Sequence, residues 1–413
     1  VLYLARIILG FAVGGASATV PVFLSETAPK RLRGFLVATD QMMIVFGQFL
    51  AFSMNAVIAH MQGGPTVTLT GDAVDVSGHV LGHAGTSVAW ETVQAAVNIA
   101  DVAGTGNGLT WRYMLVLCSL PAIALWIGIR LMPESSRWYV AKERLHDAIG
   151  ALKRVREEAE DGPLVDEMLE MVEARQHELA EEARRRGLGY VWRTPWLRKL
   201  LLVGVFLAIV NQTTGVNTVM YYAPKVLEYA GMSTSASITA QVANGVMSVI
   251  GSAIGIWLIM RFRRRQILIA DVTGVGVCLL GIAATFQLAI AGHMSAGTTP
   301  PAWAAFLILG LMAVFMLIVQ SSNGTVVWTM MGEIFPANVR GVMNGTAIFC
   351  MWVANAAITW TFPRMMESLG GGATYAVYGV LNIVIALVLL KVMPETSGRS
   401  LEQIERDMER RYS

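Results

Sequence analysis

The chain has 413 residues, of which 54% are hydrophobic and only 15% are charged, and its mean hydropathy is +0.54. Soluble domains carry about 25% charged residues, so this composition excludes an ordinary soluble protein. The net charge of +2 gives no indication of nucleic-acid binding.

Nine stretches of the chain are almost free of charge and long enough to cross about 30 Å of hydrocarbon as helices. In chain order they lie at about 1–24, 35–60, 111–132, 199–223, 237–260, 266–291, 302–331, 342–363 and 373–393. They predict an all-α, multi-pass protein of the cell membrane, embedded in the lipid bilayer.

The basic residues are unevenly distributed between the predicted spans. No Lys or Arg occurs between Met61 and Thr110, whereas residues 130–199 hold 14 of the 31. Basic loops remain on the cytoplasmic side of a membrane. We therefore expect loop 61–110 to lie outside, and the linker 133–198 and the C-terminus to be cytoplasmic.

The linker 133–198 is charged and has helical periodicity. Such a pattern favours solvated amphipathic helices that connect two membrane-embedded parts. A second interpretation is that these helices form a latch, which would hold the two parts together on the cytoplasmic side.

Residues 211–222, NQTTGVNTVMYY, place several amides inside a span. Polar groups in a bilayer interior are costly unless they face partners or a wet cavity. Asn217 and Tyr221 share a helix face, and Gln212 lies about 140° from Asn217 on an ideal helix. Gly215 and two threonines permit local unwinding there. Amides donate and accept hydrogen bonds, as sugar hydroxyls do; alternatively, these amides only hold helices together.

Two sequence patterns occur twice, which predicts two related halves. E-x-x-P-x-x-x-R-G is present at 26–34 and 333–341, and MPESSRW at 132–138 resembles MPETSGR at 393–399. Parallel six-span halves are typical of one large class of transporters.

The repeat also predicts that part of the first half is missing. Three spans lie between Asn211 and Glu333, whereas only 25 residues precede Glu26. We expect a twelve-span protein whose first three spans, roughly a hundred residues by comparison with the second half, lie ahead of Val1.

The motifs NQTTGVNTVMYY, PESSRW (133–138) and PETSGRSLEQIE (394–405) together resemble the sugar porter family of the major facilitator superfamily. The resemblance implies a fold of two six-helix halves, here nine transmembrane helices with the first three missing. It divides the chain as follows: 1–132, remainder of the N-terminal half with family helices 4–6; 133–198, cytoplasmic linker helices; 199–393, C-terminal half with family helices 7–12; 394–413, cytoplasmic tail.

The family resemblance further implies secondary active or facilitative transport of a monosaccharide or polyol by alternating access. Sugar/proton symport is favoured, with protons as the coupled ion, and the protein is expected to be a monomer without enzymatic activity, cofactor or metal. It assigns substrate binding to Gln41, Gln48, Gln212, Asn217, Tyr221, Trp328, Trp352 and Asn355. It assigns proton coupling to Arg6, whose expected aspartate partner belongs to the first span.

A cytoplasmic charge network is also implied by the resemblance. Its members are Glu26, Arg33, Glu134, Arg137, Arg264, Glu333, Arg340 and Glu395. Departures from the family pattern leave the identity of the sugar open. Met351 stands where the family has a glutamine, and Ser248 stands where it has an asparagine. Asn244, one turn away, could substitute for that asparagine.

Two other functions compete with transport. A sugar sensor of the same fold would bind without moving its ligand, but sensors carry long cytoplasmic extensions and this tail stops at Ser413. A membrane enzyme would need a nucleophile paired with a base, and no span provides that pair. His79 and His83 could in principle bind a metal, but no third ligand is evident, which favours a polar loop pair.

Overall fold

The computed structural model describes most of the chain as two compact units. The first comprises Val1–Ile44 and Leu120–Arg186, and the second Val45–Ser119 and Gly187–Ser413. The described residues are 2–29, 33–62, 65–106, 110–182, 187–295, 300–322, 326–336, 339–393, 395 and 407–410. Four predicted site side chains, those of Glu26, Arg33, Gln41 and Glu333, lie outside the described part.

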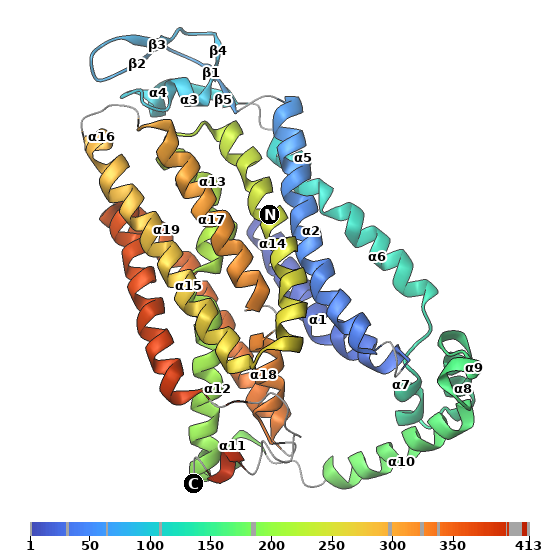
Figure 1. The fold of residues 1–413 in the computed structure, drawn as a ribbon. Coiled ribbons are helices and arrows are strands. Elements are labelled where there is room, and N and C mark those ends of the chain that lie inside the picture. The colour runs from blue at the N-terminus through green and yellow to red at the C-terminus, as the bar shows by residue number, and fades with distance from the viewer. Residues whose placement is uncertain are drawn as a thin grey trace. The chain divides into compact units, whose positions relative to one another are not determined.

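The first unit is built from helices, coloured from blue to green in Figure 1. Its elements are α1 (Leu2–Thr27), the first part of α2 (Arg33–Gln62), α6 (Ser119–Leu131), α7 (Ser136–Ala141), α8 (Leu145–Val155), α9 (Glu158–Asp161) and α10 (Leu164–Glu182). In α8 the buried residues Ala148, Ala151 and Leu152 have i, i+3, i+4 spacing, which gives the helix one apolar face. That face packs with α7 and α10 into a small core that includes Leu164 and Met168.

The loop between α2 and α5 (Thr110–Leu117) forms a small folded body with strands, which the sequence patterns do not predict. It contains β1 (Thr66–Leu69), β2 (Ala73–Val74), β3 (Val80–Gly82), β4 (Ser87–Ala89), α3 (Trp90–Val93), α4 (Ile99–Val102) and β5 (Ala103–Gly106). The strand order is β4-β1-β5 in one antiparallel sheet and β2-β3 in the other. Leu69, Ala73 and Val93 are almost fully buried and form its core.

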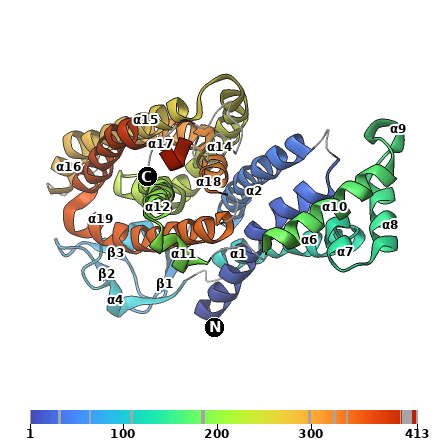
Figure 2. The same ribbon diagram turned by 90° about the horizontal axis from the view of Figure 1, so that it is seen from below.

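The second unit contains the helices α12 to α19 in a bundle. Its helical elements after the loop body are α11 (Leu188–Arg193), α12 (Pro195–Thr213), α13 (Val216–Tyr229), α14 (Thr234–Arg261), α15 (Arg264–Thr285), η1 (Phe286–Ile290), α16 (Ala291–Ser295), α17 (Ala302–Ser322), α18 (Trp328–Glu333) and α19 (Arg340–Val392). Figure 2, which looks along the bundle, shows α12 surrounded by α14, α15 and α19.

Seven helices in the described part of the chain are long and apolar enough to cross a membrane. One of them, α19, is two helices merged across Gly370, whose φ of 77° is not helical. In α1 the apolar section is the shorter stretch Tyr3–Ala16. The helices fall on the predicted stretches, but the count of nine spans is not confirmed by these criteria.

Close backbone contact holds α14 against α17. A Cβ atom built on Gly255 would lie 2.5 Å from the Ser321 carbonyl oxygen, and one on Gly251 would lie 2.5 Å from that of Leu317. Only glycine allows two helices to approach so closely, as in other small-residue interfaces of membrane helices. This contact fixes the end of α17 beside α14 and α15.

Candidate functional site

The polar segment 211–222 lies at a break between α12 and α13. Gly215 has φ 83°, a left-handed conformation that glycine adopts without steric cost. The hydroxyls of the neighbouring threonines hold the turn together: Thr214 donates to the Asn211 carbonyl at 2.8 Å, and Thr218 donates to the Gly215 carbonyl at 2.6 Å. The local unwinding predicted from the sequence is therefore present.

The break brings together amides that an ideal helix would separate. The Asn217 side-chain nitrogen donates to Gln212 Oε1 at 2.7 Å, and Gln212 Nε2 donates to Asn211 Oδ1 at 2.9 Å. All three side chains belong to residues that are 6–7% exposed. Among the described contacts, Asn217 uses one of its two N–H groups in this chain of amides. Its second N–H and its side-chain oxygen remain for a ligand.

One turn along α13 from Asn217, an aromatic pocket opens between α13 and α19. Its volume is about 540 Å³, and it is lined by Tyr221, Tyr222, Trp352, Asn355, Ala356, Thr359 and Trp360. The Tyr222 hydroxyl donates to the Thr359 carbonyl at 2.9 Å, and the Thr359 hydroxyl donates to Asn355 Oδ1 at 3.0 Å. The pocket thus combines exposed aromatic faces with a fixed polar wall.

The predicted binding residues are only partly brought together. Tyr221, Trp352 and Asn355 meet in the aromatic pocket, while Gln212 and Asn217 meet in the amide chain. Trp328 begins α18 and is 40% exposed. The remaining described prediction, Gln48, is half-buried on α2, and its side-chain nitrogen has no hydrogen-bond partner among the described residues.

Sequence reasoning did not identify three pocket residues, Ala356, Thr359 and Trp360. It also did not identify Gln241, which joins Asn244 in a polar chain on α14. Gln241 Nε2 donates to the Met220 carbonyl at 3.0 Å, and Asn244 Nδ2 donates to Gln241 Oε1 at 2.8 Å. The i, i+3 spacing of these two amides within a span is the sequence signal from which the polar chain on α14 could have been predicted.

The charged residues of the predicted cytoplasmic charge network lie in different local settings. Glu134 and Arg137 are exposed at the start of α7. Arg340 donates through Nε to the Phe335 carbonyl at 3.0 Å, and Glu395 accepts from the backbone N–H of Arg265 at 3.3 Å. Arg6, the predicted proton-coupling residue, is exposed on α1.

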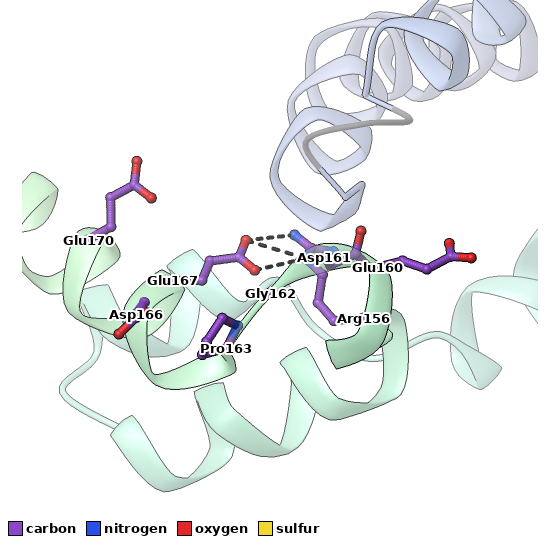
Figure 3. A pocket seen from close by; sticks show the side chains of 8 residues that line it. All are labelled: Arg156, Glu160, Asp161, Gly162, Pro163, Asp166, Glu167 and Glu170. Atoms are coloured by element: carbon purple, nitrogen blue, oxygen red, sulfur yellow. Dashed lines mark hydrogen bonds and ion pairs between the residues drawn. The ribbon is translucent and has the colours of Figure 1, made fainter.

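A buried ion pair in the linker, absent from the sequence predictions, holds the end of α1. The Arg156 side chain is 1% exposed and contacts Glu167, with 3.0 Å between Nη2 and Oε1. Its guanidinium also donates to the carbonyls of Thr27, at 2.5 Å, and Ala28, at 3.2 Å. In Figure 3 Glu167 points at the guanidinium, whereas Glu170 points away from it.

Acidic side chains also order the loop body 65–106. Asp72 accepts the backbone N–H of Ala84 at 2.7 Å, and this bond is the main cause of a pKa below the usual value for that carboxyl. Asp75 accepts from the Ser77 hydroxyl at 2.6 Å, which likewise lowers its pKa. His83 lies 3.5 Å from Asp72. The described residues contain no group of three or more His, Cys, Asp or Glu positioned to bind a metal.

Comparison with known proteins identifies a family. The chain matches the family described as "Sugar (and other) transporter" over residues 1–71 and 75–408. It is 35% identical over 405 residues to the major myo-inositol transporter IolT of Bacillus subtilis strain 168, covering 98% of this chain and 74% of that protein. It is 31% identical over 414 residues to the galactose-proton symporter of Escherichia coli K12, covering 99% and 74%.

The fold is similar to that of solved transporters. The inward-open xylose transporter XylE of E. coli matches with a TM-score of 0.70 at 26% identity, covering 99% of this chain and 72% of that one. These matches define a helical membrane transporter of the major facilitator fold. The chain belongs to the sugar porter family of that superfamily. It is a transport protein and not an enzyme.

Proposed function

We propose that this protein moves a monosaccharide or polyol across the cell membrane by alternating access, as a sugar/proton symporter. The observation that carries the proposal is the convergence of Gln212 and Asn217 at the helix break, one turn from the aromatic pocket. The relatives named for myo-inositol, galactose and xylose support a small polyhydroxylated substrate.

The site chemistry suits such a substrate. A sugar hydroxyl both donates and accepts hydrogen bonds, and Asn217 at the end of the amide chain offers both functions. The exposed face of Trp352 suits the C–H face of a sugar ring, while its N–H group can serve a hydroxyl. Unwound backbone near the middle of a span is where transporters bind their substrates. We include Gln41, Gln48 and Trp328 in the site on the family pattern.

The proposal includes a membrane arrangement. From the repeat we infer a transporter of two related halves, to which the present chain contributes the nine predicted spans. Loop 61–110 would lie outside, and the linker 133–198 and the C-terminus inside, following the distribution of basic residues. Arg6 would serve proton coupling, and the charge network from Glu26 to Glu395 would close the inner gate. Each exposed pair in that network contributes about 0–1 kcal/mol, enough to bias two states.

A binding experiment with a matched control tests the site. Gln212→Ala in the full-length protein should weaken sugar binding at least about tenfold, because a buried polar partner is lost. Gln287→Ala removes the same side chain from an exposed position of η1 and should leave binding unchanged. Calorimetry with myo-inositol, galactose and xylose measures both variants. Equal affinity for the Gln212 variant and the wild type would assign these amides to helix packing instead.

Transport itself is tested in proteoliposomes. Saturable uptake that accumulates sugar under an inward proton gradient is the expected result. Uptake that equilibrates without accumulation would indicate facilitated diffusion. Sugar binding with no uptake at all would favour the alternative, a non-transporting sensor of the same fold.

A further inference from the structure

A second pocket lies in the bundle away from the candidate sugar site. It occupies about 410 Å³ between the end of α14, the start of α15 and the end of α17. Its lining residues are Leu258, Phe262, Gln266, Ile267, Ala270, Asp271, Ile318, Ser321 and Ser322. Most of these are apolar, and Asp271 is the one ionisable residue among the nine.

Asp271 is an unusual residue for its position. It is 3% exposed, and its carboxyl lies beside the Ser322 hydroxyl, which carries no charge. It follows the first residue of α15 by seven positions, or about 10 Å along the helix axis. Acidic residues inside membrane spans are costly and commonly mark ion or proton pathways. A residue that only packed this interface would not need a carboxyl group.

No basic side chain of the described part is positioned to neutralise this carboxylate. α17 contains no ionisable residue, and Arg261 at the end of α14 does not line the pocket. On α15 itself, the Arg265 guanidinium is directed to the Leu390 carbonyl. Its neighbour Arg264 likewise does not line the pocket.

The helix α19 packs on the other side of α15 and places no charged residue beside Asp271. On α19, Leu390 contacts Arg265, and Gly379 and Ile383 pack against Gly276. The stretch of α19 level with Asp271 is therefore 380–389, which contains no ionisable residue. The group best able to neutralise the carboxylate is a proton.

We propose that Asp271 is a proton-binding site of the second half and that the pocket is its path to water. The carboxylate takes a proton from hydronium, which leaves water, and returns that proton to water when the pocket is hydrated. Ser322, whose hydroxyl is a polar neighbour of the carboxyl, is the last residue of α17. Proton binding would therefore act on the end of the helix that precedes Trp328. This inference rests on the proposed transport function and adds a proton site to it.

Infrared difference spectroscopy tests proton binding without any sugar. Wild-type protein titrated with acid should gain the carbonyl stretch of a protonated carboxylic acid, and Asp271→Asn should lack that band. Asp101→Asn, which removes an exposed acid of the loop body, is the matched control and should retain it. If wild type and Asp271→Asn have the same set of bands, the proposal is overturned.

Transport assays test whether the proton is coupled. Asp271→Asn should retain sugar counterflow, which needs no net proton movement, and lose uphill accumulation under a proton gradient. Asp271→Glu keeps the carboxyl group, so it should retain accumulation, with a changed midpoint in the pH dependence of accumulation. This variant also provides the test if Asp271→Asn does not fold. Unchanged accumulation in Asp271→Asn, or a dependence on sodium instead of pH, would overturn the proposal.

The two proposals fail separately. If wild-type protein neither binds nor exchanges sugar, the transport proposal fails, whereas the infrared titration still decides whether Asp271 binds a proton. If wild type transports but the carboxyl band is unaffected by Asp271→Asn, only the proton site is wrong.

Discussion

Replacing Arg156 with methionine should loosen the linker from the end of α1. The guanidinium is 1% exposed and makes two kinds of contact: a close ion pair with Glu167 and hydrogen bonds to the carbonyls of Thr27 and Ala28. Methionine keeps much of the side-chain length but none of the donors. The variant leaves a carboxylate and two helix-terminal carbonyls without their partner.

The size of the effect follows from burial. Removing one member of a buried ion pair costs about 3–5 kcal/mol, because the remaining charge is left uncompensated. Glu167 is 14% exposed and borders a pocket of about 270 Å³, so water can reach its carboxylate in the variant. We therefore expect the lower end of the range, about 3 kcal/mol.

Hydrogen exchange in the linker measures this loss. A decrease of about 3 kcal/mol in local opening free energy corresponds to amide exchange faster by on the order of 100-fold in α8 and α10. Arg144→Met is the matched control. Arg144 pairs with Asp147 at 2.8 Å, but the two side chains are 55% and 42% exposed, so its loss should cost at most about 1 kcal/mol. Similar exchange in the two variants would refute the argument from burial.

Three further predictions concern the bundle and the loop body. Gly255→Val should force α14 away from α17 and cost about 1–3 kcal/mol or more in thermal unfolding, whereas Gly310→Ala, with open space around it, should not. Gly215→Ala should lower stability by about 1 kcal/mol through its left-handed φ, and an unchanged melting temperature would contradict this. The lowered pKa of Asp75 stabilises the loop body above the usual value of 3.8 and ceases to do so as pH falls below it. The rate of pepsin cleavage within 65–106 should therefore rise as the pH falls below that value. The rise should be less steep in the Asp75→Asn variant than in the wild type.

Several features of the site could be predicted from local sequence. Gly215 among polar residues indicated a break, because glycine alone adopts its left-handed conformation without strain. The break then explains why Gln212 and Asn217 meet although regular helical geometry would separate them. Tyr221, at one helical turn from Asn217, lines the aromatic pocket, and its helical spacing places it on the Asn217 side of α13.

Other features depend on contacts between distant parts of the chain. Arg156 donates to backbone carbonyls 128 and 129 residues away. Every residue has such a carbonyl, so this partner leaves no signature in the sequence. The strands of the loop body are short and irregular in register, which gives little alternation to detect. Asp271 could have been found, since it is the one acidic residue between Arg265 and Glu333.

Polar residues in a span have two common explanations, helix packing and ligand binding, and hydrogen-bond satisfaction separates them. Ser248 on α14 donates to the Asn244 carbonyl at 2.7 Å, and Gln241 reaches the Met220 carbonyl, so both are used within the bundle. Asn217 retains hydrogen-bonding capacity at the end of its chain of amides, and the Asp271 carboxyl is matched by the uncharged Ser322 hydroxyl and not by a basic group. An unsatisfied polar group in a low-dielectric interior costs up to several kcal/mol, so a ligand that satisfies it during part of the cycle would offset that cost. We propose a sugar hydroxyl as the partner that completes the first, and a proton as the partner that completes the second.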